Sequence, residues 1–86
     1  MSQTNEQQRL YQVFSDALSI DISAVDDDLK YNSIKEWDSV AHMILVAQLE
    51  AAFDVMLEMD DIIDMNSVAA AKTILSKHGV NFYETL

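Results

Sequence analysis

The chain has 86 residues, half of them hydrophobic, and its 15 acidic side chains against five basic ones give a net charge of −10. This apolar fraction excludes an intrinsically disordered chain, and the length predicts one domain, 1–86, with one modest core over about 5–79. The acidic surplus disfavours nucleic acids and anionic membranes, because both are bound through lysine and arginine. It favours partners with basic docking surfaces, although solubility alone explains such a charge equally well.

The absence of cysteine excludes disulfides, thiolate metal sites and a cysteine nucleophile. Residues 1–9 lack the apolar run of a signal peptide, and no apolar stretch approaches the length of a membrane span. We therefore expect a cytoplasmic protein without a membrane span.

A first amphipathic helix is predicted up to Leu18, with Thr4 or Asn5 able to cap its start and Tyr11 at the edge of its apolar face. The i, i+3, i+4, i+7, i+8 spacing places five apolar side chains on that face. They are Leu10, Val13, Phe14, Ala17 and Leu18.

Between Ser19 and Asp38 the helical periodicity is lost. A few apolar side chains are spaced irregularly among polar ones, which predicts a long loop pinned to the core, with short helical turns around Ser23 to Leu29. These side chains are Ile20, Ile22, Val25, Leu29 and Ile34. Loops of this length inside compact domains are often functional.

The second helix is predicted to be the longest, because helix formers run without Gly or Pro from Asp38 or Ser39, either of which can cap it, to Phe53. Its core face is predicted to hold His42, Leu45, Val46, Leu49 and Phe53. A second apolar stripe lies on roughly the opposite side and comprises Val40, Met43, Ile44, Ala47 and Ala51. A small protein normally needs only one such stripe for its core.

Two further helices are predicted after a turn at residues 54–56 that returns Leu57 to the core. The first is short, residues 60–65, with Ile62 and Ile63 inward and its aspartates solvated. The second is capped by Ser67, buries Val68, Ala71, Ile74 and Leu75, and ends with Lys77 and His78 before a left-handed Gly79. The ends of the chain are expected to be mobile, with Phe82 and Tyr83 able to dock. The predicted fold class is therefore all-α, a four-helix bundle whose core is formed by its first, second and fourth helices.

Metal and hydrolytic sites find little support. A calcium-binding EF-hand loop that starts at Asp26 or at Asp54 would have the wrong residues at its ligand positions. The only two histidines, His42 and His78, have no partner at the spacing of metal ligands. We therefore expect no metal site. A Ser39–His42 nucleophile pair lacks an evident acidic orienter and oxyanion hole, and we expect no catalytic residue.

Several features together resemble the acyl carrier protein family: the long loop, Trp37-Asp38-Ser39, the helix ending Leu49-Glu50-Ala51-Ala52-Phe53-Asp54, the short acidic helix and the cap Asn66-Ser67-Val68. The resemblance runs from about Leu10 to Gly79. In that family the serine of an Asp-Ser-Leu motif carries 4′-phosphopantetheine, whose thiol holds acyl groups as thioesters. The resemblance thus implies that Ser39 is the attachment residue and that Asp38, its motif neighbour, serves recognition or capping.

The resemblance also implies partners: a phosphopantetheinyl transferase, an acyl-loading ligase or acyltransferase, and condensing or transferring enzymes, all visiting a monomeric carrier with no catalytic activity of its own. After the serine this chain has Val40, where the family more usually has leucine. Before the Asp-Ser pair it has Glu36-Trp37, where the family commonly has a glycine.

Carriers of fatty acid synthesis have acidic residues along the exposed side of this helix, where Ala41, Ile44 and Ala51 stand here. We therefore expect docking through Val40, Met43, Ile44, Ala47 and the remaining Glu50, and service in a dedicated pathway. The alternative is that Met43 and Ile44 pack under the long loop.

The core is also a candidate shelter for an acyl chain, made adaptable by Met43, Met56, Met59 and Met65. Two alternative functions stay open: a helical interaction module without a prosthetic group, and an aminoacyl or peptidyl carrier of nonribosomal synthesis.

Overall fold

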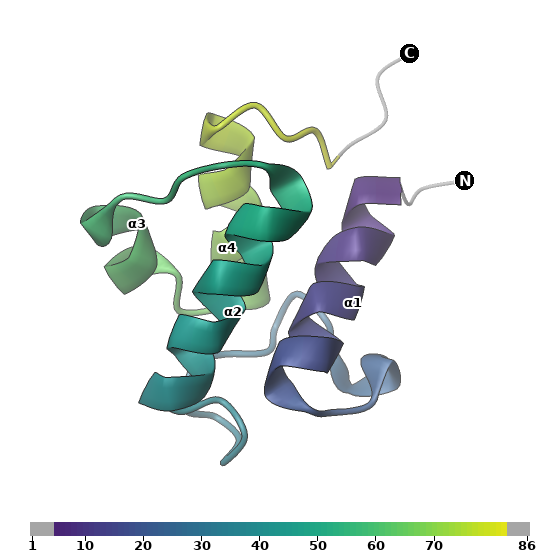
Figure 1. Cartoon of the computed structure of the whole chain (residues 1–86). Helices are drawn as coiled ribbons and strands as arrows, with labels where there is room; N and C mark the ends of the chain where they lie inside the picture. Colours follow the sequence, from purple (N-terminus) through teal and green to yellow (C-terminus); the bar gives the residue numbers. More distant parts are fainter. Residues whose placement is uncertain (1–4, 83–86) are drawn as a thin grey trace.

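Four α-helices make up the fold in the computed structural model, which describes residues 5–82 (Figure 1). They are α1 (Asn5–Leu18), α2 (Ser39–Phe53), α3 (Met59–Asp64) and α4 (Val68–Lys77), and a 3-10 turn, η1 (Ile22–Ala24), lies in the long loop. Within 5–82 the only extended pairing is an isolated bridge between Lys30 and Ser67. The all-α class, the order of the helices and the short third helix were all predicted correctly.

The core lies between α1, α2 and α4, and the predicted apolar faces of α1 and α4 are buried as expected. The largest buried side chain, Trp37, comes instead from the end of the long loop and is fully inaccessible. Its ring meets the edge of Phe14 with centroids 5.3 Å apart. Because a buried aromatic side chain contributes strongly to a core, Trp37 fixes the chain immediately before α2.

The α1–α2 loop is pinned at several points, as predicted. Val25 and Leu29 are buried, whereas Ile22 is 44% exposed and does not serve as a pin. The backbone N–H of Val68 donates to the carbonyl oxygen of Leu29 at 3.0 Å. Lys72, almost fully buried on α4, pairs with the Asp27 carboxylate at 2.8 Å. The loop is therefore tied to the start and the middle of α4.

The short helix α3 differs from its prediction. Ile63 points to solvent with 69% of its surface exposed, while Asp61, expected to be solvated, is buried. Successive residues lie about 100° apart around a helix, so Ile63 is on nearly the opposite side of α3 from Asp61, and Asp61 faces inward with the half-buried Ile62 beside it.

Asp61 is buried because its carboxylate is fully engaged. It accepts hydrogen bonds from Nε2 of His78 at 2.9 Å and from the backbone N–H of Glu58 at 3.2 Å, and it lies 3.4 Å from Nζ of Lys77. The hydrogen bond from His78, reinforced by that from Glu58, holds the pKa of Asp61 below its usual value. Asp61 therefore anchors α3 to the C-terminal end of α4.

The methionines are mostly outside the core. Met65 is buried, but Met43, Met56 and Met59 are all more than half exposed. The expectation that these side chains make the core adaptable was therefore wrong for Met43, Met56 and Met59.

The segment after α4 turns back onto the bundle. Gly79 has the expected left-handed backbone, with φ of +97°. Phe82 is fully buried and its ring contacts Phe53 with centroids 5.8 Å apart. Docking of Phe82 is thus confirmed. Thr4 and Tyr83 lie outside the described residues.

The Asp61 anchor of α3 should make the stability of the protein depend on pH. A carboxylate with a lowered pKa in the folded state stabilises the protein above its unfolded pKa of about 3.9, and this contribution is lost as the pH falls through the lowered value. Asp61→Asn should therefore be less stable than the unaltered protein at pH 7, and the difference should shrink below about pH 4. Urea unfolding at several pH values measures this difference. Asp60→Asn, an exposed neighbour, is the control, and a difference of constant size down to pH 3 would contradict the assignment.

Candidate functional site

The start of α2 is set by Asp38. Its backbone is extended, and its Oδ1 accepts a hydrogen bond from the backbone N–H of Ala41 at 2.9 Å. This is the bond made by an N-cap residue, so Ser39 becomes the first residue of the helix. Of the two caps that the sequence allowed, the structure therefore has Asp38.

The hydroxyl of Ser39 is consequently left out of the capping. Ser39 is exposed, and its Oγ lies 3.1 Å from the hydroxyl oxygen of Tyr31. The other serine at a helix start, Ser67, shows the contrast, because its Oγ accepts the backbone N–H of Ala70 at 2.9 Å and caps α4. Ser39 thus presents an accessible hydroxyl at the positive end of the longest helix in the described part of the chain.

The turn before α2 brings Tyr31 to Ser39. Asn32 adopts a left-handed backbone with φ of 66°, and its N–H donates to the carbonyl oxygen of Trp37 at 3.0 Å. This closes the segment 32–37 into a compact turn. Tyr31 and Ser39, eight positions apart, therefore become neighbours.

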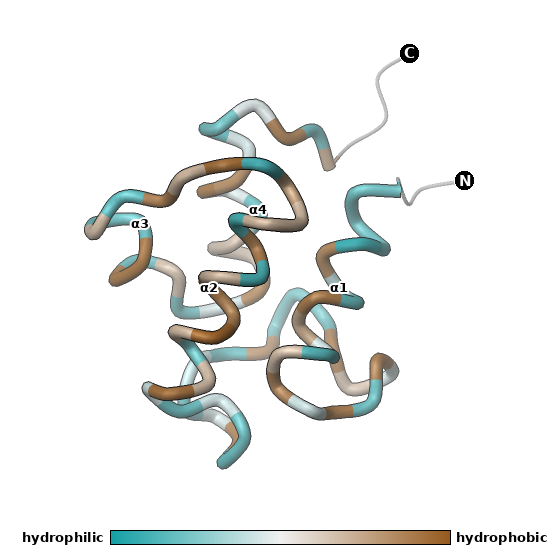
Figure 2. The backbone as a smooth tube through the Cα atoms, in the orientation of Figure 1, coloured by the Kyte–Doolittle hydropathy of each residue, from teal (hydrophilic) through white to brown (hydrophobic). Residues whose placement is uncertain are grey.

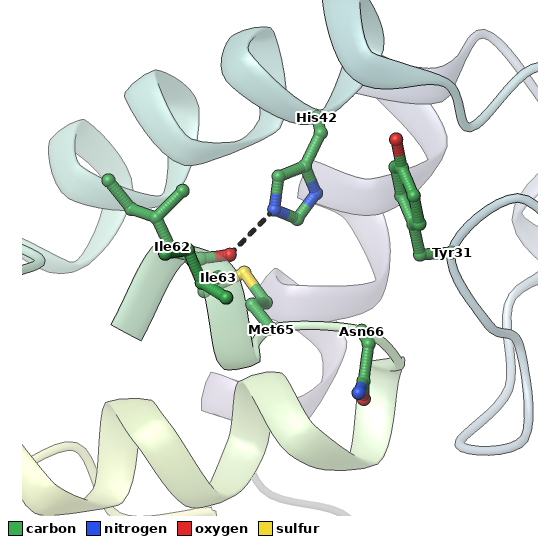
Figure 3. A pocket seen from close by; sticks show the side chains of 6 residues that line it. All are labelled: Tyr31, His42, Ile62, Ile63, Met65 and Asn66. Atoms are coloured by element: carbon green, nitrogen blue, oxygen red, sulfur yellow. Dashed lines mark hydrogen bonds between the residues drawn. The ribbon is translucent and has the colours of Figure 1, made fainter. Parts of the chain in front are cut away.

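His42 is held by both of its ring nitrogens. Nδ1 accepts from the indole N–H of Trp37 at 3.0 Å, which leaves Nε2 to carry the proton and donate to the carbonyl oxygen of Ile62 at 2.9 Å (Figure 3). His42 is part-buried on the core side of α2, as predicted. Since neither nitrogen is free and Ser39 contacts Tyr31, the structure does not support the Ser39–His42 nucleophile pair.

A pocket of about 220 Å³ lies next to this network, between α2, α3 and the loop before α2 (Figure 3). Its lining residues are Tyr31, His42, Ile62, Ile63, Met65 and Asn66. Tyr31 is thus shared between the pocket wall and the contact to Ser39.

The second stripe of α2 forms an apolar surface, here called the α2 surface, made up of Val40, Met43, Ile44 and Ala47. All four side chains are exposed, with exposed fractions of 71% for Val40, 57% for Met43 and 45% for Ile44. Figure 2 shows apolar segments along α2. Met43 and Ile44 therefore do not pack under the long loop.

Two neighbours of the α2 surface have other roles. Ala41 is buried, so the inference that it stands at an exposed position was wrong. Glu50 is half-buried, and its Oε2 accepts the backbone N–H of Leu57 at 3.0 Å, which ties the α2–α3 connection to α2.

Residues 5–82 hold neither a metal-binding cluster nor a membrane-spanning helix. No group of three or more His, Cys, Asp or Glu side chains there is arranged to hold a metal ion. None of the helices described is long and apolar enough to cross a membrane.

A bundle of three longer helices and one short one, with an exposed serine hydroxyl at the start of the second, defines a carrier-type domain. The family model described as the phosphopantetheine attachment site matches residues 8–74. A search of curated proteins found no match. The chain belongs to the phosphopantetheine attachment site family, and the resemblance to acyl carrier proteins is confirmed. It is a carrier protein of the kind that bears a covalently attached 4′-phosphopantetheine, is modified by a transferase and is visited by partner enzymes.

The site of this protein fits such a group. A phosphate ester needs a hydroxyl that is accessible and not bonded to the backbone, and an anion is favoured at a helix N-terminus. Ser39 meets both conditions, whereas Ser67 fails the first. Asp38 opposes the anion as a neighbouring acid but is needed as the cap.

Tyr31 was missed by sequence reasoning. It stands in a segment without periodicity, and only the turn at residues 32–37 brings it to Ser39. Contacts across an irregular turn have no fixed spacing in the sequence, so the sequence alone does not indicate this one.

Because Asp38 caps α2 and Ser39 does not, replacing these two residues should affect the free energy of unfolding differently. Asp38→Ala removes the cap and should lower the free energy of unfolding by about 1 kcal/mol. Ser39→Ala removes only an exposed hydroxyl and should change it by less than about 0.5 kcal/mol. Chemical denaturation measures both variants. A loss on Ser39→Ala as large as that on Asp38→Ala would show that Ser39 is a structural cap.

Proposed function

We propose that Ser39 carries the 4′-phosphopantetheine arm and that the protein presents acyl or aminoacyl groups, held as thioesters, to partner enzymes. The observation that carries this proposal is the exposed hydroxyl of Ser39, which takes no part in capping, beside the Asp38 cap. Because the side-chain cap of α2 comes from Asp38, modification of Ser39 costs no capping bond. The family supplies the prosthetic group, and the geometry favours this serine as its position.

Ser39 acts as the nucleophile when the arm is attached. Its Oγ forms an ester bond to the phosphorus that bears pantetheine in coenzyme A, and the hydroxyl proton passes to a base of the transferase. The bond from that phosphorus to the adenosine bisphosphate half breaks, and this half leaves. Once attached, the arm supplies a thiol for thioester formation. The protein itself is proposed to have no catalytic activity.

The α2 surface is proposed as the docking site for the transferase and for later partners. Its apolar side chains begin at Val40, the residue next to Ser39, and continue for two turns along α2. An enzyme that reaches Ser39 along this helix will cover them, and burial of apolar area stabilises such a complex. Glu50 is proposed to lie at the rim, with part of its carboxylate engaged by Leu57.

This apolar docking surface supports service in a dedicated pathway. Partners that grip a carrier through an acidic helix face find few acidic side chains on α2 here. Partners with an apolar recess, surrounded by basic residues that suit the net charge of −10, fit better.

The attachment residue is tested by incubating the purified protein with coenzyme A and a broad-specificity phosphopantetheinyl transferase. Intact mass should rise by one phosphopantetheinyl group, and peptide mapping should place it on Ser39. Ser39→Ala should remain unmodified, whereas Ser67→Ala, which removes the serine that caps α4, should still be modified. An arm on any other residue, or no adduct with several competent transferases, would overturn the proposal.

Docking is tested by placing a charge on the α2 surface. Ile44→Glu should lower kcat/KM of the transferase reaction by about tenfold or more, since it replaces a contact worth roughly 1.5 kcal/mol with a charge that is costly to desolvate. Gln8→Glu, which adds the same charge at an exposed position on α1, should react at the unaltered rate. Equal rates for the Ile44 variant and the unaltered protein would rule out docking through this surface.

A further inference from the structure

We propose that Tyr31 is a positioning residue for the prosthetic group, whose hydroxyl donates a hydrogen bond to the phosphodiester attached at Ser39. This inference rests on the proposed attachment at Ser39. The observation behind it is the 3.1 Å contact between the hydroxyl oxygens of Tyr31 and Ser39. The role of Tyr31 in holding the arm follows from this contact and not from membership of the family.

The Tyr31 ring is fixed from two sides. It meets the edge of Trp37 with centroids 6.1 Å apart and an interplanar angle of 88°, and it meets His42 at 5.4 Å and 68°. Both neighbours are themselves held, since Trp37 is fully buried and donates to His42. The aromatic contacts therefore orient the ring before any group is attached.

The backbone of Tyr31 is fixed as well. Its N–H donates to the carbonyl oxygen of Asn66 at 2.9 Å, beside the bridge between Lys30 and Ser67. The ring contacts and this backbone hydrogen bond thus hold the Tyr31 hydroxyl next to Ser39, although it lies at the surface. A donor held in this way loses little conformational freedom when it bonds a ligand.

Modification fixes the direction of this hydrogen bond. In the unmodified protein either hydroxyl can donate. An esterified Ser39 has no hydroxyl proton, so its oxygen and those of the phosphate can only accept. Tyr31 then becomes the donor, and a bond from O–H to a charged phosphate oxygen is shorter and stronger than one between two neutral hydroxyls.

The position of Tyr31 gives this bond a consequence for the arm. Tyr31 also lines the pocket between α2 and α3, together with His42 and Ile63 (Figure 3). A hydrogen bond from Tyr31 therefore holds the attached end of the arm on the side of α2 that faces this pocket. Without it, the phosphodiester is tethered at Ser39 alone.

The test is 31P NMR of the modified protein, with its arm confirmed on Ser39 by peptide mapping. In Tyr31→Phe, which keeps the ring contacts to Trp37 and His42, the phosphodiester signal should move toward that of free phosphopantetheine diester and narrow as the group gains motion. Tyr11→Phe is the matched control, because the Tyr11 hydroxyl is bound to Asp27 and Lys72, and its signal should match the unaltered protein.

Correct modification of Ser39 with a 31P signal unaffected by Tyr31→Phe would overturn the role of Tyr31 alone. Failure to modify Ser39 would overturn the attachment proposal and this inference together. Amide NMR spectra establish that both variants are folded.

Discussion

The hydrogen bond from the Ala41 N–H to the Asp38 carboxylate is the constraint on which the site depends. It sets the first residue of α2 and satisfies one of the backbone N–H donors of its first turn without the Ser39 hydroxyl. Two adjacent residues of similar capping ability thereby take different roles. One oxygen maintains the helix, and the other is available for chemistry.

A second set of contacts supports this cap from within the bundle. Trp37 is buried directly before Asp38, and its indole N–H reaches His42 one turn into α2. His42 in turn donates to the Ile62 carbonyl oxygen of α3. The start of α2, the core and the short helix are thus joined through three residues. Asp61 adds the link from α3 to α4 through His78. The pocket lined by Tyr31 and His42 is therefore bordered by elements that are held together.

The sequence predicts most of the fold because its long helices are strongly periodic. The apolar face of α1, the Ser67 cap and the left-handed Gly79 follow from local rules that the structure obeys. The exposed second stripe of α2 was also predicted, because a helix apolar on both sides has more such surface than a small core can bury.

The features that the sequence did not predict are those set by tertiary contacts. The apolar pattern of α2 does not fix its first residue to within one position, so it does not decide whether Asp38 or Ser39 is the cap. The burial of Trp37 and the placement of Tyr31 depend on the turn at residues 32–37, where no period exists. Asp61 looks like a solvated acid until His78 is brought to it across the bundle.

The central claim is that Asp38 keeps the cap while the Ser39 oxygen bears the arm. A crystal structure of the modified protein tests it most directly. The account predicts electron density continuous from Oγ of Ser39 to phosphorus, with Oδ1 of Asp38 still accepting the Ala41 N–H. A structure in which Asp38 has turned away and a phosphate oxygen caps α2, or in which the arm lies on another residue, would contradict it.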